Sequence, residues 1–310
     1  MLDPQARALL DMMVARGVPP THTLTPEQAR RFYVERRAVT QPTPRPLAEV
    51  AGLVAPGPLG DIALRLYRPD GLTAPAPLLV YFHGGGWVIG DLDTHDTLCR
   101  DLAHAGRCVV VAVDYRMGPE HRFPAAVDDA LAATRWLHAQ AAPLGLDPAR
   151  IAVGGDSAGG NLAAVVALAW RDAGLAPPLR LQLLIYPATD MRALAPSHTH
   201  NGQGYLLTSD TIAYFQSHYL DPDQREDWRA SPLLHGKLAG LAPALVLTAG
   251  FDPLRDEGRQ YADALSAAGT PAQYVCFERQ IHGFITMGGV LDEAHTAVAL
   301  CGQVLQRALA

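Results

Sequence analysis

From about residue 60 onward, patterns typical of strands and of helices alternate along the chain. Most of the strand patterns are continuous Val/Ile/Leu runs, which is typical of strands that are buried on both faces. Such alternation predicts an α/β fold with a mostly parallel central sheet flanked by helices. The predicted strands span 62–69, 77–83, 108–116, 150–156, 179–187, 244–252 and 272–278, and the predicted helices span 125–141, 158–174, 257–269 and 292–309.

The N-terminal segment, residues 1–45, lies outside this alternation and contains two amphipathic helix patterns. Asp3 with Pro4 predicts the start of the first helix, because Asp is a preferred N-cap and Pro suits the first helical position. Thr25 and Gln28 have the spacing of a capping box and predict the start of the second. A Pro-rich stretch, QPTPRP, follows as a semi-rigid link to the rest of the chain.

A second segment outside the alternation is an insertion at about 190–232, between two predicted strands, with a helix pattern at 209–220. Insertions of this length in a compact domain are usually lids or binding elements. We expect residues 1–45 to contribute to a helical cap with this insertion, and residues 46–310 to form the main α/β domain that carries it. The alternative is that both segments are peripheral packing.

Charge and hydropathy limit the partners of the chain. The formal net charge is −6 and no Lys/Arg-rich run occurs, so nucleic acid and stable association with an anionic membrane are not expected. The first residues lack the pattern of a signal peptide, and no apolar run approaches the length of a membrane span. We therefore expect a cytoplasmic protein with a small-molecule substrate, and the sequence leaves open whether it is a monomer or a homodimer.

A serine lies on a predicted turn between a strand and a helix. Residues 151–163 read IAVGGDSAGGNLA, in which Gly155, Ser157 and Gly159 form the pattern G-x-S-x-G. The glycines let neighbouring chain pass close to a strained turn. A serine that only caps the helix is the alternative, but the position between strand and helix favours a nucleophile. No lysine follows either glycine cluster, which excludes a phosphate-binding P-loop.

A serine nucleophile needs a base, and the order expected for this type of fold is Ser, then an acid, then His. His282 follows the last predicted strand, and Asp252 ends the strand before it. Both residues therefore belong to the sheet edge that carries Ser157, and we predict that His282 is the base and Asp252 the acid. Asp256 and Glu257 are the rival acids, although their place at the start of a helix suits carboxylates for another reason.

The remaining histidines have simpler interpretations. His95 lies among three aspartates in GDLDTHD, but this loop leads into a helix, where capping by Asp and Thr is far commoner than metal binding. His198, His200 and His218 fall in the predicted cap and are possible substrate contacts. We predict no metal site and no cofactor.

Three consecutive glycines follow the strand that ends at His83, in the stretch YFHGGGWVIG. Acyl transfer creates an oxyanion, and a glycine run lets backbone N–H groups point at it without side chains in the way. We predict an oxyanion hole formed by Gly84, Gly85, Gly86 and the N–H of Ala158. Within it, Gly85, Gly86 and Ala158 are the donors and Gly84 sets the turn, while His83 supports the loop.

Five ordered motifs carry a resemblance that extends over nearly the whole chain. They are HGGGW (83–87), DYRMGPE (114–120), GDSAGGN (155–161), DPLRDEG (252–258) and HGF (282–284). The chain resembles the hormone-sensitive-lipase-like carboxylesterases, the bacterial family IV branch of the α/β-hydrolase fold. The resemblance implies Ser157 as nucleophile, His282 as base, Asp252 as acid, and the glycines with Ala158 as oxyanion hole. One departure is that Met117 and Gly118 replace the Leu-Ala usual in this family, which affects at most the shape of the pocket.

The sequence thus predicts a cofactor-free serine carboxylesterase that hydrolyses short- to medium-chain esters through an acyl-enzyme. The same three residues would also serve an amidase, a thioesterase or a sugar deacetylase. A non-catalytic small-molecule receptor is the remaining alternative, because the gibberellin receptors of plants resemble this fold but lack the catalytic histidine. The presence of His282 argues against that alternative.

Overall fold

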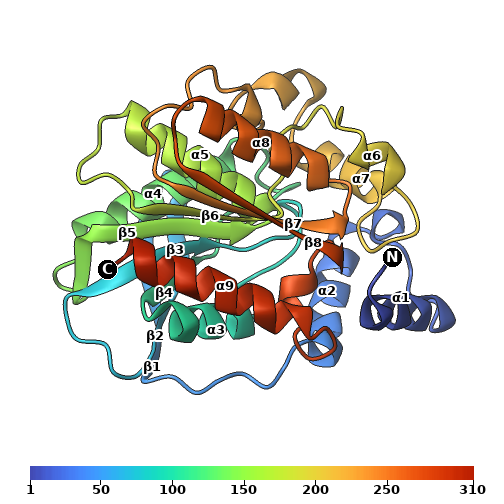
Figure 1. The fold of residues 1–310 in the computed structure, drawn as a ribbon, viewed down its shortest axis with the longest axis horizontal. Helices are drawn as coiled ribbons and strands as arrows, with labels where there is room; N and C mark the ends of the chain where they lie inside the picture. Colours follow the sequence, from blue (N-terminus) through green and yellow to red (C-terminus); the bar gives the residue numbers. More distant parts are fainter.

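The computed structural model describes residues 1–310, except for the side chain of Arg37. Within the described residues, eight strands form one sheet in the order β1-β2-β4-β3-β5-β6-β7-β8 (Figure 1). Strand β2 is antiparallel to both of its neighbours, and all other neighbouring strands are parallel. The strands are β1 (Glu49–Gly57), β2 (Gly60–Arg68), β3 (Ala76–Phe82), β4 (Val109–Val113), β5 (Leu146–Asp156), β6 (Leu181–Ile185), β7 (Ala244–Phe251) and β8 (Ala272–Ile281).

Helices cover both faces of the sheet, as Figure 1 shows. Helices α3 (Asp96–Gly106) and α9 (Glu293–Ala308) pack together on one face, and α4 (Ala125–Ala139), α5 (Ala158–Asp172) and α8 (Arg255–Ala267) lie on the other. The predicted mostly parallel sheet flanked by helices is therefore confirmed. Strand β1 is an addition, because the sequence patterns did not indicate it.

The remaining helices gather beyond the carboxyl ends of the parallel strands, at the right of Figure 1. They are α1 (Pro4–Ala15) and α2 (Pro26–Thr40) from the N-terminal segment, and α6 (Ser197–His200) and α7 (Ser209–Tyr219) from the insertion. Short 3₁₀ turns occur at Thr21–Thr23, Pro222–Glu226, Pro232–Leu234 and Phe284–Thr286. None of the described helices is long and apolar enough to cross a membrane.

The helix starts predicted in the N-terminal segment are present. The Asp3 carboxylate accepts the N–H of Gln5 at 2.8 Å, which caps α1. The Thr25 hydroxyl accepts the N–H of Gln28 at 3.2 Å, and the Gln28 side chain accepts the N–H of Thr25 at 3.0 Å. This reciprocal pair satisfies two backbone donors at the helix start, so α2 begins where its sequence specifies.

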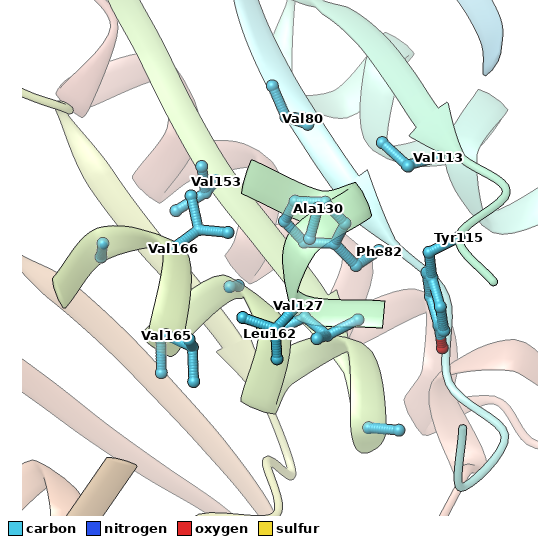
Figure 2. Close-up of a cluster of buried hydrophobic side chains, with 14 of the residues drawn as sticks. Val80, Phe82, Val113, Tyr115, Val127, Ala130, Val153, Leu162, Val165 and Val166 are labelled. Carbon is cyan, nitrogen blue, oxygen red and sulfur yellow. The ribbon is translucent and has the colours of Figure 1, made fainter. Parts of the chain in front are cut away.

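The core consists of two apolar layers, one on each side of the sheet. Because successive side chains of a strand point to opposite faces, Val80 and Phe82 of β3 face α4 and α5, while Leu79 and Tyr81 face the side of α3 and α9. Figure 2 shows part of the first layer, which combines strand residues Val80, Phe82, Val113 and Val153 with helix residues Val127, Ala130, Leu162 and Val166. Burial on both faces explains the continuous apolar strand runs, and it makes the sheet a rigid base for the loops at its carboxyl edge.

Candidate active site

Ser157 occupies the turn between β5 and α5 and has a strained backbone, with φ 57° and ψ −116°. A Cβ added at either Gly155 or Gly159 would overlap the carbonyl oxygen of Phe82 on the neighbouring strand. Glycine is therefore required on both sides of the serine because β3 passes too close for any side chain. The turn holds the Ser157 side chain at the carboxyl edge of the sheet, at the N-terminus of α5.

Two residues from later strands complete a chain of hydrogen bonds to this serine. His282 Nε2 lies 2.9 Å from Ser157 Oγ, and His282 Nδ1 lies 2.7 Å from Asp252 Oδ2. Asp252 is fully buried at the end of β7, and its Oδ1 accepts the N–H of Leu254 at 2.8 Å. Because the Asp252 carboxylate can only accept, the proton of the neutral His282 ring lies on Nδ1. Nε2 is then the acceptor that faces the Ser157 hydroxyl.

The rival acids of the sequence prediction have other partners. Asp256 pairs with Arg255 at 2.7 Å and accepts the N–H of Ser197 at 2.9 Å. Glu257 is buried and lies 2.6 Å from His198 Nε2. The structure thus brings Asp252 to His282 and directs the other two carboxyl groups elsewhere.

The glycine loop, the HGGGW stretch at 83–87, lies against the turn that carries Ser157 and has an unusual backbone. Gly85 and Gly86 have φ values of 128° and 60°, which favour glycine. A Cβ at Gly86 would overlap the ring of Phe215 from α7. Among the described residues, the N–H groups of Gly85, Gly86 and Ala158 have no acceptor, so they are free to bind an anion beside Ser157.

Gly84 differs from the other two loop glycines. Its N–H donates to Asp156 Oδ1 at 2.9 Å, and its carbonyl oxygen lies 2.9 Å from His83 Nδ1. Both of its backbone groups are therefore occupied. Gly84 anchors the loop and sets its turn, so its inclusion among the oxyanion-hole residues holds only in that supporting sense.

His83 lies inside the loop and is almost completely buried. Its ring stacks on Tyr115 at 4.4 Å, and the Tyr115 hydroxyl donates to the His83 carbonyl at 2.6 Å. Burial, and after it the neighbouring His95 ring, lower the pKa of His83 to about 4. At neutral pH the imidazole is therefore uncharged, and its Nδ1–H can donate to Gly84.

Asp156 is a site residue that the sequence patterns did not single out. It directly precedes Ser157, is buried, and accepts hydrogen bonds from Tyr81 Oη at 2.7 Å and from the N–H of Gly84. His95 Nε2 lies 3.3 Å away. Burial alone would raise the pKa of Asp156, but His95 and the Tyr81 hydroxyl outweigh it and lower that pKa. The ionised carboxylate ties the serine turn to the glycine loop.

The acidic loop around His95 does not form a metal site. Thr94 and Asp91 bond to each other reciprocally, and Arg65 pairs with Asp93 at 2.8 Å and with Asp96 at 3.4 Å. Among the described residues, no group of three or more His, Cys, Asp or Glu side chains is arranged to hold a metal ion. Helix α3 begins at Asp96, as expected for a loop that leads into a helix.

A pocket of about 110 Å³ lies over Ser157 and His282. Its walls come from the glycine loop, from α2 and from the insertion, including Phe215 and Leu207. Of the three cap histidines, His198 lines the pocket, where it is paired with Glu257; His200 and His218 are not among its lining residues. The arrangement can activate a hydroxyl nucleophile and stabilise an oxyanion next to it.

Comparison with known proteins agrees with this geometry. A family model described as the alpha/beta hydrolase fold matches residues 79–286. The chain is 46% identical over 292 residues to the carboxylic ester hydrolase LipN of Mycobacterium tuberculosis, covering 92% of this chain and 77% of that protein. It is 40% identical to an ethyl acetate hydrolase of Pseudomonas putida, with 99% of each chain covered. A solved ester hydrolase from the metagenome of Lake Arreo superposes with a TM-score of 0.95 at 44% identity, with 99% of each chain covered.

Proposed function

The chain belongs to the α/β-hydrolase fold family, in its hormone-sensitive-lipase-like branch, and from that premise we propose that it is a serine carboxylesterase. The observation that supports this most directly is the Ser157–His282–Asp252 hydrogen-bond chain, with distances of 2.9 and 2.7 Å. The substrate is a small carboxylic ester. The relatives named as ester hydrolases over most of their length support the same reaction class.

Acylation uses the groups around Ser157. The Oγ atom attacks the ester carbonyl while His282 Nε2 removes its proton, and Asp252 stabilises the imidazolium that forms. The oxyanion lies among the N–H groups of Gly85, Gly86 and Ala158, which together lower the barrier because they are oriented before the reaction begins. His282 then gives its proton to the departing alcohol, and the C–O bond breaks.

Deacylation repeats the cycle with water as the nucleophile. His282 takes a proton from the water as its oxygen adds to the acyl-enzyme carbonyl. The second tetrahedral intermediate then collapses as the bond to Ser157 Oγ breaks and His282 gives the proton to that oxygen, which releases the acid and restores Ser157. The pocket volume of about 110 Å³ over the serine favours acyl groups at the short end of the range expected from the sequence.

The two segments outside the alternating core form the cap of this enzyme. Residues 1–45 provide α1 and α2, and the insertion at about 190–232 provides α6 and α7. They meet where His22 Nδ1 lies 3.5 Å from the Thr211 hydroxyl. Both segments contribute residues to the pocket over Ser157, which is the observation that supports a shared cap. The cytoplasm is the proposed location, on the sequence features given above.

The test is the substitution Ser157→Ala, assayed with p-nitrophenyl acetate. Turnover should fall by roughly 10³-fold or more, since the nucleophile is lost while binding remains. Ser266→Ala, in an exposed position on α8, is the matched control and should leave turnover unchanged. Near-normal activity of Ser157→Ala would contradict the proposal.

A further inference from the structure

A second cavity lies between α1 and α2 and is larger than the pocket over Ser157. Its volume is about 420 Å³, and its walls are mainly apolar, with Leu9, Leu10, Met13, Phe32 and Val39 among them. We call it the N-terminal chamber. Among the residues whose side chains the structure describes, three charged ones line the chamber, Arg16, Glu35 and Arg36, and most of the others are apolar, so the space is suited to hydrocarbon.

The N-terminal chamber adjoins the catalytic pocket. Tyr33, Leu206, Thr211 and Met287 line both spaces, and so does Arg36, whose guanidinium lies 4.8 Å from the centre of the Tyr33 ring. These shared residues border both spaces, and we call them the neck. A molecule that is bound at Ser157 and extends past the neck therefore enters the chamber.

The two volumes suit different parts of a substrate. An apolar cavity of about 150 Å³ is enough to hold one benzene ring. The catalytic pocket, at about 110 Å³, is smaller than this, whereas the chamber at about 420 Å³ is well above it. The catalytic pocket alone has room for a small group, and an extended apolar arm needs the chamber.

The position of the neck indicates which arm of an ester enters the chamber. Met287 and Leu206 lie beside Gly283, within 4 Å of where a Cβ there would be, and Gly283 follows His282 directly. The departing alcohol must lie near His282 Nε2, because it takes its proton from that atom. The alcohol side of the ester therefore faces the neck. Trp87 and Phe215 line the catalytic pocket without lining the chamber, so they are left for the acyl side.

We propose that the N-terminal chamber is the binding site for the alcohol arm of the substrate, and that this arm is a medium-length alkyl chain or an aryl group. The inference rests on the proposed esterase function and adds the substrate class to it. Each methylene that moves from water into the chamber should raise kcat/KM about fourfold, the equivalent of ~0.8 kcal/mol.

The experiment uses two ester series that share methyl acetate as their first member. One series is acetates of methanol, butanol, hexanol and octanol, and the other is methyl esters of butanoic, hexanoic and octanoic acid. Titration of the released acid at constant pH measures both. In the wild-type enzyme kcat/KM should rise with alcohol length much more steeply than with acid length.

Two variants fill the chamber from opposite walls. Met13→Trp acts from α1 and Val39→Trp from α2, and both positions line the chamber without lining the catalytic pocket. Val34→Trp is the matched control, because Val34 lies on the same helix as Val39, is similarly exposed, and lines neither space. Because Met13, Val34 and Val39 are all at least partly exposed, the larger side chains should be accommodated without unfolding.

The expected result is that Met13→Trp and Val39→Trp lower kcat/KM for octyl acetate at least tenfold while methyl acetate and methyl octanoate change little. Val34→Trp should follow the wild type throughout. A loss confined to methyl octanoate, or an unchanged profile in both series, would overturn the inference alone. If the wild-type enzyme hydrolyses neither methyl acetate nor p-nitrophenyl acetate, the proposed function fails and the inference fails with it.

Discussion

Asp156 Oδ1 accepts the backbone N–H of Gly84 at 2.9 Å, a contact between residues 72 positions apart in the chain. Asp156 precedes the proposed nucleophile, and Gly84 precedes the two glycines whose N–H groups are free. The contact therefore fixes the distance between the nucleophile and the donors that must stabilise the oxyanion. Errors of about 1 Å in such a distance are costly for catalysis, so the Asp156 side chain is a positioning group.

Asp156→Asn should lower kcat for p-nitrophenyl acetate by roughly 10- to 100-fold with little change in KM. Tyr81 and Gly84 both donate to Oδ1, and His95 Nε2 faces Oδ2. The amide replaces the oxygen that faces His95 with a donor and removes the negative charge that strengthens the hydrogen bonds from Tyr81 and Gly84. Loss of a whole oxyanion donor costs about 10²- to 10³-fold, and a displaced loop should cost less. Steady-state kinetics at pH 7.5 measures the effect.

Tyr81→Phe is the comparison for this prediction. It removes one donor to Asp156 but leaves the bond to Gly84, so the loop should stay in place and kcat should fall less than threefold. If both variants lower kcat equally, the effect comes from general disturbance of a buried site rather than from the position of the loop.

Asp252→Asn should reduce kcat by about 10⁴-fold while the protein stays folded. An amide at this position donates to His282 Nδ1, which places the proton of the neutral ring on Nε2 and removes the acceptor that Ser157 needs. Asp256→Asn tests the rival assignment directly. Because Asp256 pairs with Arg255 and Ser197, its substitution should leave kcat within about twofold of the wild type. A large loss in the Asp256 variant and a small one in the Asp252 variant would reverse the assignment.

The positions of Ser157, Asp252 and His282 were predictable because each follows a strong strand pattern. Parallel strands place their carboxyl ends at one edge, so residues far apart in the sequence must meet there. Strand β1 was not predictable in the same way. It is an edge strand with mostly exposed or half-exposed side chains, so it lacks the continuous apolar run of the buried strands.

The hydrogen-bond network around Asp156 could not be predicted from the sequence patterns either. Tyr81, Gly84 and His95 reach this carboxylate from β3, the glycine loop and the start of α3, and each contact joins residues at least 61 positions apart. Such contacts depend on how the loops pack, which has no local signature. The same holds for the buried pair of His198 and Glu257, which joins the cap to α8.

His83 should make the protein more sensitive to acid. Its pKa is about 4 in the folded protein, below the ordinary value of 6.5, because burial disfavours the charged ring. As the pH falls, His83 is therefore protonated in the unfolded chain before it is protonated in the folded protein. The free energy of unfolding is full above pH 6.5 and falls by up to roughly 3 kcal/mol between pH 6.5 and 4.

His83→Asn removes this titration and keeps an N–H that can donate to the Gly84 carbonyl. The free energy of unfolding, measured in urea at pH 7 and pH 4, should fall less in the variant than in the wild type. An equal loss in both proteins would show that His83 does not contribute to the acid sensitivity.

Gly118, where the family motif usually has alanine, should be needed because helix α7 of the cap packs directly against it. A Cβ at Gly118 would overlap the carbonyl oxygen of His218 in the last turn of α7, although the Gly118 backbone itself is compatible with alanine. The N–H of Gly118 donates to the backbone carbonyl oxygen of Trp87 at 2.8 Å, and the Trp87 ring stacks on Tyr219 at 4.5 Å, so α7 is packed tightly against this loop.

Gly118→Ala, which introduces the residue usual in the family, should therefore push α7 away from the loop. We expect a loss of about 1–3 kcal/mol in stability, typical of overpacking, measured as a lower urea midpoint. The KM for p-nitrophenyl acetate should rise several-fold, because Phe215 on α7 moves away from Gly86. Gly236→Ala is the control, since no atom lies within 4 Å of a Cβ there, and its midpoint should be unchanged or slightly higher. If Gly118→Ala matches the control in both measurements, α7 adjusts freely and the pocket does not depend on this contact.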